Sequence, residues 1–267
     1  MSYFEAILLG LVQGIAEFLP ISSTGHLILT REFFGFQTNY DLAIDATIQF
    51  ATILAVLIYF RKDLSELAVG LWKRIQGVPL SKEMNILFFA LVLGTVPGVI
   101  AGLLLEDTMG TFFRDSHLVA WMLIGGSLLF ILAEYVSSKI TEHTELSIRR
   151  GILIGFFQAL ALIPGTSRSG ATISGGMLLG LTREKAARFA FLLSFPIILG
   201  SGAKKILELK EAGVFESEWT TILVASLVAF TSGIASIHYL LKFLKNHTLY
   251  VFVVYRILLA LLVFAIV

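Results

Sequence analysis

The chain of 267 residues contains no cysteine and few charged residues. Without cysteine it can form no disulfide, thiolate nucleophile or cysteine-ligated metal centre. Asp, Glu, Lys and Arg make up 15% of the residues, whereas about 25% is typical of a soluble domain. A net charge of +1 argues against a nucleic-acid partner, which needs a basic face. Too few polar groups are present to cover a surface that faces water.

Apolar residues are abundant instead, at 57% of the chain. A membrane-spanning helix needs about 20 mostly apolar residues. We therefore predict an all-α polytopic membrane protein that forms one membrane domain, residues 1–267. The six predicted spans are Met84–Leu105, Ser116–Ala133, Trp219–Leu241, about Thr248–Val267, about Ala43–Phe60 and about Lys185–Ala203.

Two further apolar regions, Phe4–Thr30 and Gly151–Leu181, are interrupted in their middles by Leu19–Gly25 and Pro164–Gly170. Proline and glycine break a helix, and each remaining piece spans about half a bilayer. Broken backbone at that depth is stable only where it is buried in protein or lines a wet cavity. We predict two re-entrant helical hairpins whose tips lie near the middle of the membrane.

The two interrupted regions resemble each other. Gln13–Gly25 and Gln158–Gly170 each carry a proline and a Ser/Thr cluster, and each precedes three predicted spans. We predict two repeats, residues 1–140 and 141–267. Because three is odd, the second repeat is inverted relative to the first, and such repeats place a site at their interface.

The basic residues outside the hairpins predict the orientation, because cytoplasmic loops are enriched in Lys and Arg. The larger group, predicted as cytoplasmic, is Arg61, Lys62, Lys73, Arg74, Lys82, Lys139, Arg149, Arg150, Arg183, Lys185, Arg188, Lys242 and Lys245. The smaller group is Arg31, Arg114, Lys204, Lys205 and Lys210. Both termini are then outside. The segment Leu64–Ile75 is expected to be a short amphipathic helix on the cytoplasmic face.

Four polar residues stand out in the interrupted regions. Glu17 is flanked by apolar residues, and Gln13 lies one helical turn before it; His26 follows the first break, and Arg168 lies in the second. An ionisable residue at membrane depth is costly and is a candidate for function. The structural alternative is a Glu17–Arg168 pair that only holds the hairpins together.

Hydroxyl groups surround both breaks: Ser22, Ser23 and Thr24 in the first, and Thr166, Ser167, Ser169 and Thr172 in the second. Each cluster could simply cap a helix. Two clusters on two broken helices, together with one arginine, favour a cradle for an anion. Helix starts supply free N–H groups, and arginine binds phosphate oxygens with two hydrogen bonds.

These residues match the needs of phosphoanhydride hydrolysis, which requires charge stabilisation, a nucleophile and a proton acceptor. Arg168 is the candidate for the first role. Ser23 or a bound water is the candidate nucleophile, and His26, one turn beyond Ser23, is the candidate base. Glu17 could orient His26, hold a proton or bind a divalent cation.

Other polar residues are weaker candidates. Asp45 and Gln49 share one face of a predicted span, and either support the site or are structural. Arg256 lies inside the last span and is expected to pair with a neighbouring helix. Solvated positions near span ends are expected for Glu106, Asp107 and Glu134.

The two motifs, QGIAEFLPISSTGH at Gln13–His26 and PGTSRSGAT at Pro164–Thr172, resemble the undecaprenyl-diphosphate phosphatase family of bacteria, also known as the bacitracin-resistance family. The resemblance covers the whole chain. It implies a hydrolase of the bacterial plasma membrane that removes the terminal phosphate of undecaprenyl diphosphate. The product is the monophosphate carrier used in peptidoglycan synthesis. It also implies inverted repeats with re-entrant helices and a site open toward the outer face.

The resemblance also implies roles for single residues. Ser23, Thr24 and His26 match the catalytic loop of the family, and Arg168 matches its phosphate-binding arginine. Glu17 matches the second acidic position of its first motif, whereas Gln13 stands where some members have Glu. The family's need for a divalent cation, typically Mg²⁺, makes Glu17 a candidate metal ligand. Further substrate-binding candidates are Gln13, Ser22, Thr24, Thr166, Ser167, Ser169 and Thr172.

The expected partners are the lipid diphosphate substrate and membrane lipid, with no nucleic acid, and a homodimer is one candidate assembly. The alternative function is a flippase or transporter for a lipid phosphate that uses the same anion site, because inverted repeats with broken helices are common in transporters. Ser23 and His26 distinguish the two, because a carrier needs neither a nucleophile nor a base.

Overall fold

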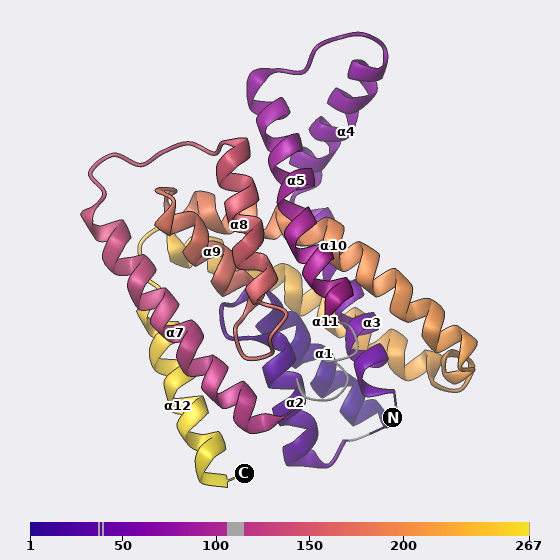
Figure 1. Ribbon diagram of the computed structural model, residues 1–267. Coiled ribbons are helices and arrows are strands. Elements are labelled where there is room, and N and C mark those ends of the chain that lie inside the picture. Colours follow the sequence, from indigo (N-terminus) through magenta and orange to yellow (C-terminus); the bar gives the residue numbers. More distant parts are fainter. Residues whose placement is uncertain (37, 39, 106–114, 267) are drawn as a thin grey trace.

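The computed structural model describes residues 1–36, 38, 40–105 and 115–266. The described residues form helices and connecting loops, with no strand (Figure 1). The expectations for Glu106, Asp107 and Arg114 lie outside this range. The helices are α1 (Tyr3–Phe18), α2 (Ser23–Phe34), α3 (Asp41–Tyr59), α4 (Arg61–Ile75), α5 (Lys82–Leu104), α7 (Ser116–Lys139), α8 (Ile148–Leu160), α9 (Arg168–Leu178), α10 (Arg183–Glu211), α11 (Val214–Leu244) and α12 (Tyr250–Ile266).

Five helices are long and apolar enough to cross a membrane: α3, α5, α7, α10 and the Glu218–Leu244 part of α11. They coincide with five of the predicted spans and are candidates for membrane-spanning helices. The sixth corresponds to α12, an apolar helix of 17 described residues. That is shorter than the roughly 20 residues that a span needs, so the sixth span stays a prediction.

The two interrupted regions each form a pair of short helices. Helices α1 and α2 have 16 and 12 residues, and α8 and α9 have 13 and 11. Each is shorter than a bilayer-spanning helix. The interruptions predicted at Leu19–Gly25 and Pro164–Gly170 therefore coincide with the breaks between these helices.

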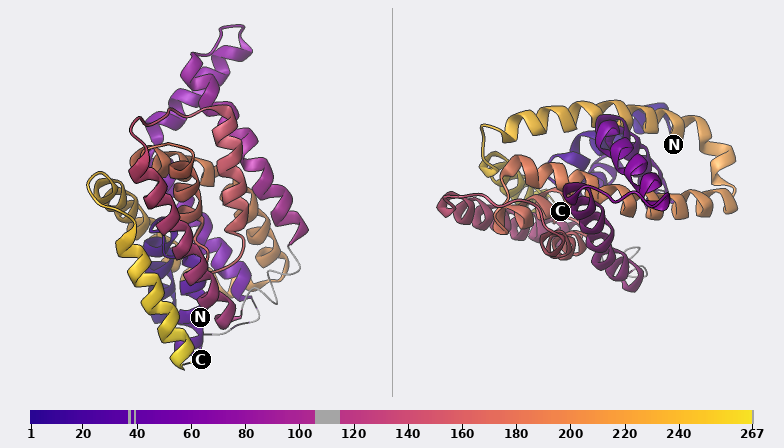
Figure 2. Two further views of the ribbon diagram at one scale, coloured as in Figure 1. Left: turned by 60° about the vertical axis from the view of Figure 1, so that its left-hand side comes forward. Right: turned by 90° about the horizontal axis from the view of Figure 1, so that it is seen from above.

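Helices α1 and α8 pack against long helices from the other half of the sequence. Helix α1 lies along α11 and α8 lies along α5, while α3 packs on α10 and α7 on α12. Helix α4 and the start of α5 project from one end of the molecule, and both termini lie at the opposite end (Figures 1 and 2). The bundle thus surrounds the two breaks with longer helices.

Glycine allows two of these packings to be close. A Cβ atom on Gly10 of α1 would lie 2.3 Å from the carbonyl oxygen of Ala225 on α11, and one on Gly155 of α8 would lie 2.1 Å from that of Gly94 on α5. Any larger residue would force the helices apart. Small residues of this kind are the usual means by which apolar helices approach closely.

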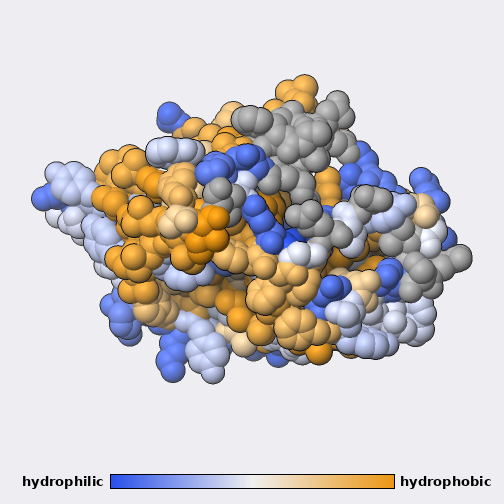
Figure 3. Space-filling view, turned by 90° about the horizontal axis from the view of Figure 1, so that it is seen from below, coloured by the Kyte–Doolittle hydropathy of each residue, from blue (hydrophilic) through white to orange (hydrophobic). Residues whose placement is uncertain are grey.

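Large apolar side chains remain exposed on the outer helices. Examples are Trp121 and Leu128 on α7, Tyr239 on α11 and Leu258 on α12, each more than 60% exposed. Seen from the end where the termini lie, hydrophobic residues cover much of the face, with hydrophilic residues between them (Figure 3). A lipid environment accounts for such exposure, because soluble proteins rarely expose large apolar patches.

Glu134 corrects one expectation, because it is 2% exposed rather than solvated. Its carboxylate pairs with Arg183 at the start of α10 and accepts a hydrogen bond from the backbone N–H of Leu249 at 2.7 Å. Helix α7 continues past the predicted end of its span, to Lys139. The longer helix places Glu134 beneath α10 and the start of α12, where a sequence pattern gives no sign of burial.

Candidate active site

The two breaks have the same local backbone. Ser22 caps α2 and Ser167 caps α9, and both have φ of 76°, in the left-handed region. Their hydroxyl oxygens accept hydrogen bonds from the backbone N–H groups of Gly25 and Gly170, at 3.3 and 3.2 Å. A non-glycine residue with this φ is strained, and such strain is concentrated at functional sites.

The two breaks contact each other directly. The Ser22 hydroxyl accepts a hydrogen bond from the backbone N–H of Gly165 at 3.0 Å, and the Ser169 hydroxyl donates to the carbonyl oxygen of Leu19 at 3.1 Å. Ser22 and Ser169 are both buried. The helix starts that follow the breaks, at Ser23 and Arg168, are therefore held next to each other.

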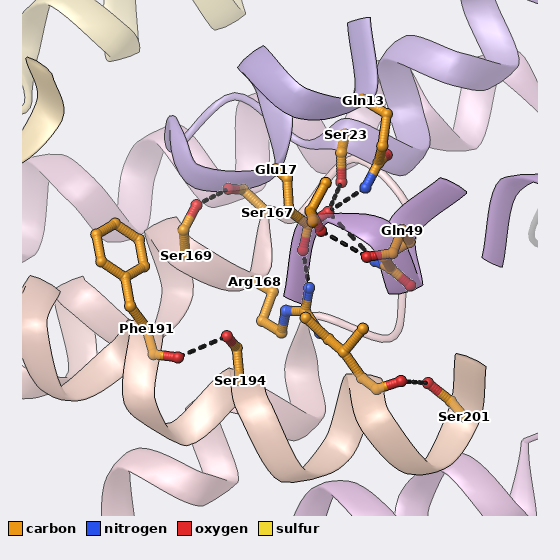
Figure 4. A network of polar contacts seen from close by, with 12 residues as sticks. Gln13, Glu17, Ser23, Gln49, Ser167, Arg168, Ser169, Phe191, Ser194 and Ser201 are labelled. Atoms are coloured by element: carbon orange, nitrogen blue, oxygen red, sulfur yellow. Dashed lines mark hydrogen bonds and ion pairs between the residues drawn. The ribbon is translucent and has the colours of Figure 1, made fainter. Parts of the chain in front are cut away.

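Glu17 is the centre of the polar network (Figure 4). Its Oε2 accepts hydrogen bonds from Gln13 Nε2 at 2.8 Å, Ser23 Oγ at 2.7 Å and Gln49 Nε2 at 3.2 Å. Its Oε1 forms an ion pair with Arg168. Glu17 is 6% exposed, so a buried carboxylate is satisfied by four partners from α1, α2, α3 and α9.

Arg168 is more accessible than the carboxylate that it binds. Its side chain is 19% exposed, against 2% for the side chain of Glu17. Only Nη2 of Arg168 donates to Glu17. Among the described residues, no hydrogen bond engages the other N–H groups of this guanidinium, which leaves them for the oxygens of an anion.

His26 has different neighbours from those predicted. Its Nδ1 lies 2.7 Å from the carbonyl oxygen of Ser22, and its Nε2 lies 2.7 Å from the hydroxyl of Tyr255, whose ring stacks on the imidazole. A carbonyl oxygen only accepts, so Nδ1 carries a proton. Both ring nitrogens are engaged, and the hydroxyl of Ser23, for which His26 was the candidate base, donates to Glu17 instead.

Asp45 and Gln49, which share a face of α3, belong to different clusters. Gln49 joins Glu17 in the site, whereas Asp45 binds the buried guanidinium of Arg31 at 2.6 Å. The sequence did not distinguish these two outcomes. The distinction depends on which helices pack against each turn of α3.

The remaining predicted residues have three kinds of environment. Thr24 is exposed at the start of α2. The Thr172 hydroxyl donates to the carbonyl oxygen of Arg168 at 2.7 Å, and Ser167 lies 3.3 Å from Ser169 between their hydroxyl oxygens. Thr166 is buried, and its hydroxyl has no hydrogen-bond partner among the described residues. The structure thus brings these groups around Arg168 but commits most of them to local bonds.

The donor set around Glu17 limits how a metal could bind. Mg²⁺ is usually held by one or two carboxylates together with waters and substrate phosphates. Glu17 is the carboxylate of this network, with the amides of Gln13 and Gln49 beside it. The described residues contain no cluster of three or more His, Cys, Asp or Glu that could hold a metal. The site fits a cation shared with a phosphate ligand better than one held by protein alone.

Tyr255 and Gln49 are the residues of the site that the sequence motifs did not identify as part of it. Tyr255 contacts His26 across 229 residues of chain, and Gln49 contacts Glu17 across 32. Gln49 lies in α3 and Tyr255 in α12, which are apolar helices outside the motifs. A polar residue in an apolar helix is a signal in the sequence, but it does not show which residue it will contact.

Comparison with known proteins agrees with this geometry. The family model "Bacitracin resistance protein BacA" matches residues 6–262. A protein of Hahella chejuensis named undecaprenyl-diphosphatase is 42% identical over 97% of this chain and 96% of its own length. A protein of Myxococcus xanthus with the same name is 45% identical over 98% of this chain and 88% of its own length. With both motifs inside the matched range, the chain belongs to the bacitracin resistance protein BacA family.

Proposed function

We propose that this chain is a multi-pass membrane enzyme that hydrolyses undecaprenyl diphosphate to undecaprenyl phosphate and inorganic phosphate. The observation that carries the proposal is the contact of Glu17 with both Ser23 and Arg168 at the meeting of two helix breaks. Relatives of this chain are named for the same activity. That naming favours hydrolysis over transport of a lipid phosphate by the same site.

Arg168 and the two helix starts bind the diphosphate in this proposal. In this proposal, the remaining N–H groups of the guanidinium and the backbone N–H groups of the helix starts at Ser23 and Arg168 bind the phosphate oxygens. Positive charge and oriented N–H groups stabilise the charge that develops on the transferred phosphoryl group. Substrate-binding roles for Gln13, Ser22, Thr24, Thr166, Ser167, Ser169 and Thr172 are part of this proposal.

Ser23 is the nucleophile that the geometry supports best. Its hydroxyl donates to Glu17 Oε2 at 2.7 Å, the distance expected between a nucleophile and its base. Ser23 Oγ bonds to the terminal phosphorus, its proton passes to Glu17, and the bond from phosphorus to the bridging oxygen breaks. Water then releases phosphate from Ser23 and restores the hydroxyl.

His26 supplies the second proton-transfer group. It follows Ser23 by three residues on α2, so the two side chains lie on one face of the helix. With Nδ1 bound to the carbonyl oxygen of Ser22, Nε2 is the nitrogen that can exchange a proton. We propose that Nε2 donates a proton to the oxygen of the leaving monophosphate.

In this proposal a divalent cation would have both Glu17 and the diphosphate as ligands. Such an ion would neutralise charge on the phosphate oxygens. The residues that would face it are Glu17 and the side-chain oxygens of Gln13 and Gln49. The proposed assembly is a homodimer, and a mass measurement of the protein in detergent tests it.

The topology proposed for this enzyme has six spans and two re-entrant hairpins in inverted repeats, 1–140 and 141–267. Matching backbone at Ser22 and Ser167 supports the repeats. The position of both termini at the end opposite α4 supports an even number of spans (Figure 2). The site then opens to the outer face of the bacterial plasma membrane. Single cysteines at positions 2 and 78 of this cysteine-free chain, labelled with an impermeant maleimide on intact cells, test the orientation: only position 2 should react.

Phosphate release from undecaprenyl diphosphate by the purified protein in detergent tests the function. The wild-type chain should release one phosphate per substrate, and Ser23→Ala and His26→Ala should both lose most of the turnover. Full turnover in both variants would exclude the assigned chemistry. Movement of labelled lipid phosphate across vesicles without phosphate release would favour the transport alternative instead.

A further inference from the structure

Arg256 is a fully buried guanidinium that the proposed chemistry does not use. It lies in α12, the last apolar helix, and is 0% exposed. A buried charge is costly unless it is paired or fully hydrogen-bonded. The hydrogen-bond acceptors of Arg256 among the described residues therefore indicate why the charge is there.

These acceptors are all uncharged. Arg256 donates to the carbonyl oxygens of Pro20 at 3.3 Å, Gly165 at 2.8 Å, Leu123 at 3.1 Å and Met122 at 3.2 Å, and to the Ser127 hydroxyl at 3.2 Å. Its guanidinium also lies 4.8 Å from the centre of the Phe130 ring. The expected pairing of Arg256 with a neighbouring helix is found with α7, and Arg256 also contacts residues outside that helix.

Two of these acceptors belong to the two helix breaks. Pro20 lies in the first break, two residues before the cap Ser22, and Gly165 lies in the second, two residues before the cap Ser167. One guanidinium therefore bridges both breaks, while the other acceptors fix it to α7. The Ser22 hydroxyl also bonds to the backbone of both breaks, but Ser22 itself lies in the first of them, whereas Arg256 holds both from a third element, α12.

Gly126 of α7 makes room for this bridge. A Cβ atom at Gly126 would lie 2.2 Å from Nη2 of Arg256 and 2.8 Å from the carbonyl oxygen of Thr166. A Cβ atom added to the adjacent Gly125 would have no neighbouring atom within 4 Å. Gly126 therefore faces the Arg256 guanidinium closely, whereas its neighbour Gly125 faces open space.

We propose that Arg256 is a positioning residue that sets the spacing between the two breaks, and through it the spacing between Ser23 and Arg168. It acts through the backbone of Pro20 and Gly165 and touches no substrate. Lysine cannot replace it, because a single ammonium group on a flexible stem cannot reach both carbonyl oxygens and α7 together. The kinetic consequence rests on the proposed function; the structural consequence does not.

The test compares Gly126→Ala with its neighbour Gly125→Ala, and adds Arg256→Lys. The first displaces the guanidinium, the second adds the same methyl group in open space, and the third keeps the charge but loses the fork. Hydrogen–deuterium exchange of the full chain in detergent measures how fast the backbone amides of residues 19–25 and 163–169 exchange, and it needs no substrate. Phosphate release, normalised to folded protein, reports kcat and KM.

We expect faster exchange in both breaks for Gly126→Ala and Arg256→Lys, with the exchange of α5 unchanged. We expect kcat to fall about 100-fold, as for a reacting group displaced by about 1 Å, with KM little changed. Gly125→Ala should match the wild type in all of these measurements. Should Arg256→Lys prove unstable, Gly126→Ala still decides through the exchange of the first break, because its added methyl group meets Arg256 and, in the second break, Thr166.

Wild-type exchange in both breaks of Gly126→Ala and Arg256→Lys would overturn the proposal, as would a change confined to one break. Faster exchange with unchanged kcat would overturn the catalytic part. If the wild-type chain released no phosphate at all, the proposed function would fail, while the exchange comparison would still decide whether Arg256 bridges the two breaks.

Discussion

Glu17 and Arg168 form an ion pair across 151 residues of chain, and the pair joins the first helix break to the second. The other oxygen of the Glu17 carboxylate accepts a hydrogen bond from the Ser23 hydroxyl. In the proposed reaction the diphosphate binds the other N–H groups of Arg168 and so weakens its ion pair with Glu17. Binding of substrate would then free the carboxylate to act as the base for Ser23, which links phosphate binding to activation of the nucleophile.

Replacing Arg168 with alanine should lower kcat/KM by about two orders of magnitude or more, because lost stabilisation of transition-state charge costs about 3–4 kcal/mol. The measurement is phosphate release from undecaprenyl diphosphate in detergent. Arg149→Ala is the matched control, since Arg149 is an exposed arginine at the start of α8. A near-normal rate for Arg168→Ala would reject its role.

Glu17→Gln and Ser23→Ala should each reduce kcat by about 100- to 10 000-fold, the range for removal of a general base. Because the two groups are assigned to one proton transfer, the double variant should be little slower than either single variant. A complete double-mutant cycle of phosphate release measures this coupling. Additive losses would show that Glu17 and Ser23 act in separate steps.

The motifs contain most of the information about the site itself. Polar residues beside Pro20 and Pro164 stand out within apolar segments, and they predicted that the two breaks would meet around Glu17 and Arg168. That inference succeeds because a buried charge has few ways to be satisfied other than by an opposite charge. The five helices that could cross a membrane were predicted from their length and apolar composition.

The sequence could not predict which polar residues of the apolar helices outside the motifs would join the site. Gln49 and Asp45 are one helical turn apart, yet only Gln49 reaches Glu17. Tyr255 and Arg256 are adjacent, yet one contacts His26 and the other both breaks. Each outcome depends on the rotation and crossing of helices far apart in sequence, and one chain's hydrophobic pattern does not specify those.

Gln13→Glu should retain activity and lower the Mg²⁺ concentration that gives half-maximal phosphate release. The Gln13 amide donates to Glu17 at 2.8 Å, so a second carboxylate there would repel Glu17 unless a cation lies between them. Mg²⁺ is commonly held by one or two carboxylates with substrate phosphates. Titration of EDTA-treated protein with Mg²⁺ measures the shift, with Gln13→Leu as the control. A severe loss of activity at every Mg²⁺ concentration would contradict the prediction.

Glu134→Gln should destabilise the fold without changing the chemistry. It leaves Arg183 without its ion pair and weakens the acceptor for the buried N–H of Leu249. A hydrogen bond to a charged group contributes about 1.5–3 kcal/mol and one to a neutral group about 0.5–1.5 kcal/mol, so the weaker acceptor should cost about 1 kcal/mol. Arg183 adds little because it is partly exposed. The thermal unfolding midpoint in detergent should fall, with kcat per folded molecule unchanged. The control is Glu145→Gln, which breaks the exposed pair with Lys185 and should have almost no effect.

Tyr255→Phe tests whether the hydroxyl group that holds His26 matters for turnover. The phenyl ring keeps the stacking on the imidazole, and Nδ1 keeps its bond to Ser22, so only the 2.7 Å contact at Nε2 is lost. A less restrained imidazole should spend less time aligned with the leaving oxygen, and kcat should fall about tenfold, the cost of roughly one hydrogen bond of 1–1.5 kcal/mol.

The comparison that identifies the cause of this loss is the pair of His26→Ala variants, made with and without Tyr255→Phe. If the tyrosine acts through the histidine, the second substitution should have no further effect once His26 is absent. Tyr239→Phe, on the exposed face of α11, controls for the loss of a tyrosine hydroxyl elsewhere. A full additional loss in the His26→Ala background would mean that Tyr255 contacts the substrate itself, and the lipid-facing side of α12 would then belong to the binding site.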